Sequence, residues 1–181
     1  MIFEQTRSAI ASQNRTAQRR ADVKELIGVF KSAFPTLDFR ILEKVTAVNA
    51  QASILNGVRS VDLFGGFSYH PRIFHDAMVF VLLHEAGHHL SRGCRLPWMS
   101  KLACDCSADN WALTEGQVQI NKQDCRFDLE KALDQIEMAT KPISQSFSTK
   151  GSSRCAFLNW NERKRRLLES ELNNRSICAI V

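Results

Sequence analysis

The stretch VFVLLHEAGHHLSRG, residues 79–93, places His84 and His88 four positions apart, with Glu85 directly after the first histidine. The turns before the histidines are wholly apolar. A proline upstream and the glycine at the end of the stretch are typical helix boundaries, so we predict one helix over about 72–91. Because residues four apart share a helix face, both imidazoles point the same way.

A metal ion is the simplest partner for two imidazoles in such apolar surroundings, because burying them without a partner would cost free energy. A carboxylate directly after the first imidazole, here Glu85, can reach the open position of the ion and take a proton from water bound there. The pattern His84-Glu85-x-x-His88 therefore predicts a catalytic Zn²⁺ site. The alternative is a pair of core histidines whose hydrogen bonds are satisfied without a metal.

A catalytic zinc site needs a third protein ligand, which we expect downstream. In the segment KLACDCSADNWAL, within a second predicted helix over about 98–115, Asp105 and Asp109 are four apart and share a face. We predict that Asp105 binds the ion and that Asp109 accepts the ring N–H of a ligating histidine. Two alternatives stay open: both aspartates are simply solvated, or another side chain is the third ligand. The candidates for that replacement are His70, Cys104 and Cys106.

The remaining patterns predict an α+β fold. Two strand-like runs, over 44–55 and 58–64, flank the pair Asn56-Gly57, which is a strong signal for a β-hairpin. Further helices are predicted at about 16–34, 128–138 and 161–172. We therefore expect a small antiparallel sheet beside several helices.

Length and composition indicate one domain over 1–181, with an apolar share of 44%. No apolar run approaches the roughly 18 residues of a membrane helix, and the N-terminus has no signal-peptide pattern. We therefore expect a soluble, cytoplasmic protein whose six cysteines are reduced. A run rich in Ser, Thr, Lys and Gly predicts a mobile loop around 140–158.

The net charge of +5 is modest, and the positive residues are scattered apart from short runs such as RKRR at 163–166. Such a run usually forms a solvated helix face. No nucleic acid or membrane partner is therefore expected, and the sequence carries no signal for the oligomeric state.

The pattern His84-Glu85-x-x-His88, followed by Asp105-x-x-x-Asp109, resembles the gluzincin metallopeptidases. The flanking DCSADNWAL looks like the second metal-binding helix of HtpX-like and ImmA/IrrE-like peptidases. This resemblance covers the middle of the chain well and the C-terminal part poorly. It implies a zincin-like fold, in which a small antiparallel sheet packs with the HExxH helix and a second helix carries the acidic ligand. Asp105 stands where these families have Glu and is one methylene shorter, so either the two helices pack closer or the ion shifts.

The resemblance implies a zinc-dependent endopeptidase that acts on a protein or peptide substrate, with zinc-activated water as nucleophile and Glu85 as general base. Such sites commonly bind substrate as an added strand, and we expect that sheet edge at GGFSYH, residues 65–70. Tyr69 and His70 are candidates to bind substrate and polarise its carbonyl. Two other functions remain open: a non-catalytic, metal-binding regulatory module, and an ImmA-like protease that cleaves a repressor protein.

Overall fold

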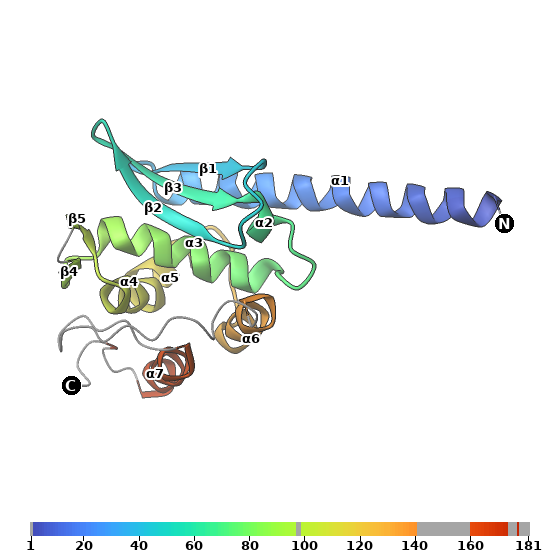
Figure 1. Ribbon diagram of the computed structural model, residues 1–181. Helices are drawn as coiled ribbons and strands as arrows, with labels where there is room; N and C mark the ends of the chain where they lie inside the picture. The colour runs from blue at the N-terminus through green and yellow to red at the C-terminus, as the bar shows by residue number, and fades with distance from the viewer. Residues whose placement is uncertain (1, 97–98, 141–159, 174–176, 178–181) are drawn as a thin grey trace.

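The computed structural model describes residues 2–96, 99–140, 160–173 and 177, and its fold is α+β, as predicted (Figure 1). The strands are β1 (Asp38–Leu42), β2 (Ala50–Leu55), β3 (Val58–Phe64), β4 (Arg95–Leu96) and β5 (Met99–Ala103). The helical elements are α1 (Ile2–Ala33), α2 (Gly65–Ser68), α3 (His75–Leu90), α4 (Asp105–Trp111), the π-helical turn η1 (Ala112–Gly116), α5 (Gln117–Asn121), α6 (Leu129–Thr140) and α7 (Trp160–Asn173).

The main sheet has the strand order β1-β3-β2. β2 and β3 form the predicted hairpin, and Asn56 and Gly57 have φ angles of 50° and 81°, the left-handed region that such a turn requires. β1 runs parallel to β3, so the prediction of a purely antiparallel sheet is wrong. Arg40 of β1 lies opposite the buried Asp62 of β3 and binds it through two hydrogen bonds of 2.7 and 3.0 Å. This pair joins residues far apart in the sequence, so local patterns do not reveal it.

The connection from β1 to β2, residues 43–49, crosses directly over Gly65 and Gly66. A Cβ at Gly66 would lie 2.0 Å from the Thr46 carbonyl oxygen, and a Cβ at Gly65 would lie 2.2 Å from that of Glu43. The two glycines therefore let the chain cross itself. They begin the short helix α2, so the predicted sheet edge at this point is wrong.

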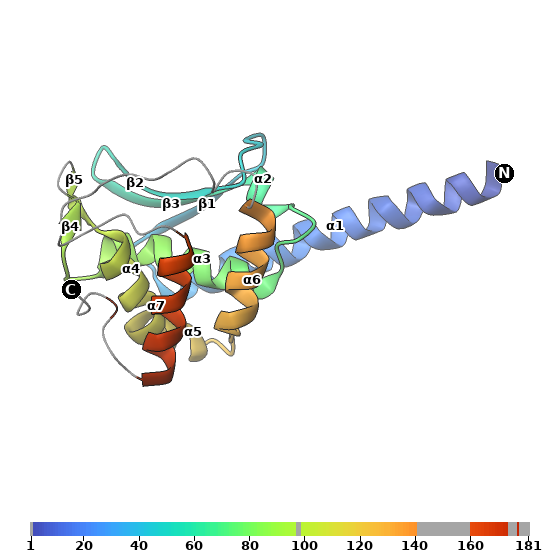
Figure 2. The same ribbon diagram turned by 60° about the horizontal axis from the view of Figure 1, so that its bottom comes forward.

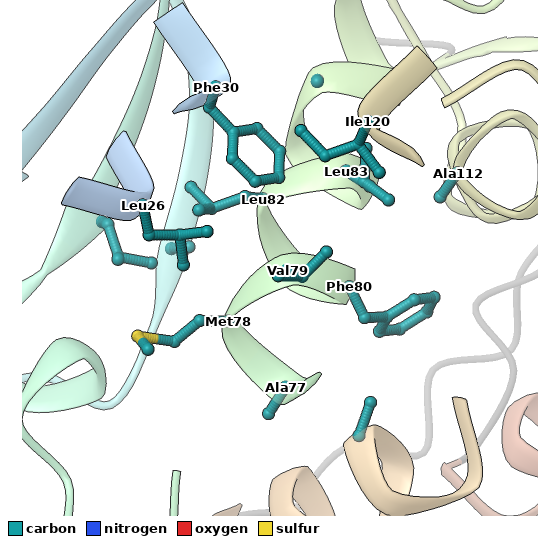
Figure 3. Close-up of a cluster of buried hydrophobic side chains, with 14 of the residues drawn as sticks. Leu26, Phe30, Ala77, Met78, Val79, Phe80, Leu82, Leu83, Ala112 and Ile120 are labelled. Carbon is teal, nitrogen blue, oxygen red and sulfur yellow. The ribbon is translucent and has the colours of Figure 1, made fainter. Parts of the chain in front are cut away.

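α3 runs through the centre of the fold and is buried on nearly every side (Figure 3). Leu26 and Phe30 of α1 lie beside its side chains, and Ile120 of α5 lies near Leu83 (Figure 3). A helix that is apolar all round belongs in a core. The predicted helix is thus confirmed apart from its first turn, and its burial carries the histidine pair into the interior.

The segment before Asp105 is a strand, not the start of a helix. β5 pairs with β4 in a separate two-stranded sheet. The helix begins only after Cys104, whose backbone is extended, and it continues through η1 and α5 to Asn121. The predicted helix over about 98–115 is therefore wrong in its first turns.

α6 and α7 lie on the side of α3 that faces away from the main sheet, and α1 extends beyond the rest of the fold toward its N-terminus (Figures 1 and 2). Both C-terminal helices have nearly the predicted bounds. None of the described helices combines the length and the apolar character that a bilayer crossing requires. The predicted loop around 140–158 lies, beyond Thr140, outside the described residues.

The cysteines differ in state. Cys94 is disulfide-bonded, whereas Cys104, Cys106 and Cys125 carry thiols. The expectation that every cysteine is reduced is therefore wrong.

Candidate metal centre

A single glycine brings the two helices of the site together. Gly87 lies between Glu85 and His88, where α3 meets α4. A Cβ at Gly87 would lie 2.6 Å from the Ala108 carbonyl oxygen and 2.9 Å from its Cα, so only glycine allows this backbone approach. The contact sets the start of α4 beside the end of α3, where the histidines lie.

His84, His88 and Asp105 come together in a group that could hold a metal ion. The Nε2 atoms of His84 and His88 are 3.1 Å apart. Asp105 Oδ1 lies 3.7 Å from His84 Nε2 and 3.6 Å from His88 Nε2. Ligand atoms bound tetrahedrally at about 2.0–2.2 Å from zinc lie about 3.3–3.6 Å from one another. The three predicted ligands thus form a triangle of the size that one ion requires.

Hydrogen bonds fix the direction of the imidazole lone pairs. His88 Nδ1 lies 2.7 Å from the Ala103 carbonyl oxygen, which can only accept, so Nδ1 donates. His84 Nδ1 lies 2.7 Å from Asp109 Oδ1 and donates to it. A neutral imidazole that donates through Nδ1 carries a bare lone pair on Nε2. The two lone pairs then face each other at 3.1 Å, an arrangement that is repulsive unless a proton or a metal ion lies between them. The donor set therefore fits a metal ion.

Asp109 is buried and binds partners from two helices. Arg163 of α7 donates to it through Nε at 2.8 Å and through Nη2 at 2.6 Å, and the same Nη2 lies 3.1 Å from His84 Nδ1. Burial alone would raise the pKa of Asp109, but the charge of Arg163, together with His84, holds it well below its usual range. Asp109 is thus a carboxylate that orients both side chains.

The two histidines differ in their electrostatics. Burial and the charge of Arg163 lower the pKa of His84, but Asp109 outweighs both and the net direction is upward. Burial lowers the pKa of His88, and the neighbouring His84 lowers it further. His88 is therefore held neutral, and the bond to Asp109 makes His84 the more basic ligand.

Glu85 lies in the wall of a cleft of about 350 Å³ that the three predicted ligands also line. β2 contributes Gln51 and Ala52 to the same cleft. Because β2 is an outer strand of its sheet, one of its edges has no partner strand within that sheet. A second pocket, of about 150 Å³, shares His84, Glu85 and Arg163 with the cleft. Its apolar wall includes Phe67, Phe80, Val81, Ile136 and Trp160.

The structure does not bring Tyr69 and His70 to this group, and neither lines the cleft or the second pocket. The Tyr69 hydroxyl donates to Glu43 at 3.3 Å, and Arg20 lies over its ring. His70 Nδ1 accepts the backbone N–H of Arg72 at 3.2 Å.

Arg163 belongs to the site although the sequence does not predict it, because a basic run such as RKRR is typical of a solvated helix face. Its side chain is only 25% exposed, whereas Arg165 is 50% exposed and pairs with glutamates of its own helix. The helical spacing contains the missing signal. Arg163 lies three residues after Trp160 and four before the buried Leu167, so it shares their inward face.

No family model, curated protein or solved structure matches this chain.

Proposed function

We propose that this protein is a zinc-dependent endopeptidase, in which His84, His88 and Asp105 hold Zn²⁺ and Glu85 is the general base. The observation that carries the proposal is the pair of facing Nε2 lone pairs beside the Asp105 carboxylate. Glu85 lines the same cleft, where a site that only binds a metal has no need of it. The resemblance of the sequence pattern to gluzincin metallopeptidases supports the same function.

A zinc ion bound by these ligands would lower the pKa of a water molecule to about 7. Glu85 takes the proton as the water adds to the peptide carbonyl, and it later delivers that proton to the leaving amine. Asp109 holds His84 in the tautomer that leaves Nε2 free to bind. Arg163 lines the cleft and holds the Asp109 carboxylate in place through two hydrogen bonds.

The substrate class follows from the walls of the cleft. An extended peptide can pair with the outer edge of β2, which supplies backbone donors and acceptors without regard to sequence. The apolar pocket beside Glu85 can take one side chain of that peptide. We therefore expect a preference for unfolded segments over folded substrates.

The test compares the wild type with Glu85→Gln, using Glu130→Gln on the exposed face of α6 as a matched control. We expect about one zinc per chain in all three proteins. Casein should be cleaved by the wild type and by Glu130→Gln but not by Glu85→Gln. Zinc without cleavage in the wild type would overturn the peptidase and favour a metal-binding regulatory module. Absence of zinc from protein purified without chelator would overturn the metal site as well.

A further inference from the structure

Two thiols flank the proposed ligand Asp105. The Sγ atoms of Cys104 and Cys106 lie 3.5 Å apart, and Cys104 Sγ lies 3.3 Å from Ser107 Oγ. Cys104 is the N-cap residue of α4. Because an N-cap side chain folds back over the first helical turn, its thiol reaches the residues that follow Asp105. The proposed peptidase mechanism uses neither thiol.

We propose that Cys104 and Cys106 are a reversible thiol–disulfide modification site that releases the metal when it is oxidised by a small-molecule disulfide such as glutathione disulfide. This inference rests on the metal group of the proposed function and does not require peptidase activity.

The reaction proceeds by two exchanges. Cys106 is the more exposed of the two thiols, so it attacks first. Its thiolate bonds to one sulfur of the small disulfide, whose S–S bond breaks and releases one thiolate. Cys104 then attacks the mixed disulfide at Cys106 and expels the second. The two protein thiols lose two electrons and two protons, and the small disulfide is reduced to two thiols.

The new bond changes the position of Asp105. A disulfide has an S–S distance of about 2.0 Å, so the two Sγ atoms have to approach by about 1.5 Å. Asp105 is the residue between them and moves with the first turn of α4. Its Oδ1 lies 3.6 and 3.7 Å from the histidine Nε2 atoms, and metal–ligand bond lengths in a proper site vary by only about 0.2 Å, so a shift of Asp105 weakens its bond to the ion. Oxidation should therefore leave two imidazoles without the carboxylate ligand.

The experiment uses the full chain, freed of metal and treated with either reduced glutathione or glutathione disulfide. Trypsin cleavage after Lys101 and Lys122 releases residues 102–122, which contain Cys104 and Cys106 and no other cysteine. After oxidation this fragment should be lighter by two hydrogen atoms. Zinc affinity, measured by competition with a chromophoric chelator, should fall at least about tenfold, the lower end of the effects seen when the support of a ligand is lost. A reductant should restore it.

Matched variants separate the switch from general oxidation. Cys104→Ser and Cys106→Ser should keep their zinc affinity in glutathione disulfide, whereas Cys125→Ser should lose it as the wild type does. Cys106→Ala takes the place of either serine variant that fails to fold by circular dichroism. The proposal is overturned if the fragment stays reduced, or if its disulfide forms while the zinc affinity is unchanged. If oxidation and reduction change the zinc affinity as expected but the chain never cleaves casein, the proposed peptidase activity is overturned and the proposed thiol–disulfide site is not.

Discussion

Two helices, α4 and α7, support the candidate metal group of His84, His88 and Asp105, and they are held in opposite ways. α4 has seven residues, four of them buried: Ser107, Ala108, Asp109 and Trp111. Its backbone touches that of α3 at Gly87. α7 has 14 residues, all described, of which Leu167 alone is buried. Trp160 and Leu168 are only partly buried against the core, and charged pairs supply the rest: Arg163 binds Asp109, and Lys164 binds Asp134 and Glu137 of α6, each at 2.7 Å.

Because the two helices are attached differently, the position of the ligands and the charge around them depend on different kinds of contact. Close packing resists any change of volume and is insensitive to salt. Ion pairs tolerate small shifts and weaken as ionic strength rises. The position of the ligands therefore depends on α4, whereas α7 adds a charge and the wall of a pocket. Asp109 is the point at which the two supports meet, since it belongs to α4 and binds Arg163.

Replacement of Asp109 should have the largest effect on both stability and zinc affinity. Asp109→Ala leaves Arg163 without its carboxylate and His84 without the acceptor that fixes its tautomer. The free energy of unfolding should fall by about 3 kcal/mol, the low end for a broken buried pair, because the arginine is a quarter exposed. Zinc affinity should fall about 10- to 100-fold. Urea denaturation and chelator competition measure the two effects, and a variant as stable as the wild type would show that α7 is held elsewhere.

Acid should weaken the pair of Asp109 and Arg163 in the wild type and so lower the free energy of unfolding. The pKa of Asp109 is depressed in the folded chain, against about 3.9 when unfolded, so its contribution to stability is complete above about pH 4. That contribution is lost as pH falls from there toward the folded pKa. The difference in unfolding free energy between wild type and Asp109→Ala should therefore be constant from neutral pH to about pH 5 and narrow below about pH 4. A difference that stays constant down to the acid transition would contradict the pairing.

The close contact between Gly87 of α3 and the backbone of Ala108 in α4 can be tested by adding one methyl group. In Gly87→Ala the new Cβ meets the Ala108 backbone, which has no flexible end to move away. Stability should fall by about 1–3 kcal/mol, as for other overpacked sites, and zinc affinity should fall with it. Gly28→Ala in α1 is the matched control, since its Cβ meets nothing within 4 Å. That variant should gain about 0.4–1 kcal/mol. Equal effects of the two substitutions would show that α4 is not in tight contact.

Features that repeat within one element could be predicted from the sequence. α3 follows from its apolar turns, and the hairpin follows from Asn56-Gly57. The ligand group follows because the spacings from His84 to His88 and from Asp105 to Asp109 each define a helix face. These signals need only a few neighbouring residues.

Features that depend on distant partners could not be predicted in this way. β1 is placed by the pairing of Arg40 with Asp62, and Arg163 turns inward because Asp109 is buried 54 positions earlier. β5 was missed because its pairing with β4 overrides the apparent helical pattern around it. Tertiary context overrides local propensity in each case.

The smallest expected effect concerns the outer attachment of α7. Lys164→Ala removes the link from α7 to Asp134 and Glu137, and the free energy of unfolding should fall by at most about 1 kcal/mol, the usual limit for partly exposed pairs. Lys131→Ala is the control, because its partner Asp128 lies within the same turn and joins no second helix. At about 1 M salt, where the Debye length is only about 3 Å, the difference between Lys164→Ala and the wild type should shrink. Zinc affinity should stay unchanged at both salt concentrations, since the three proposed ligands lie on α3 and α4 and none lies on α7. If the loss of stability persists in high salt, α7 is packed as α4 is, and the contrast between the two helices fails.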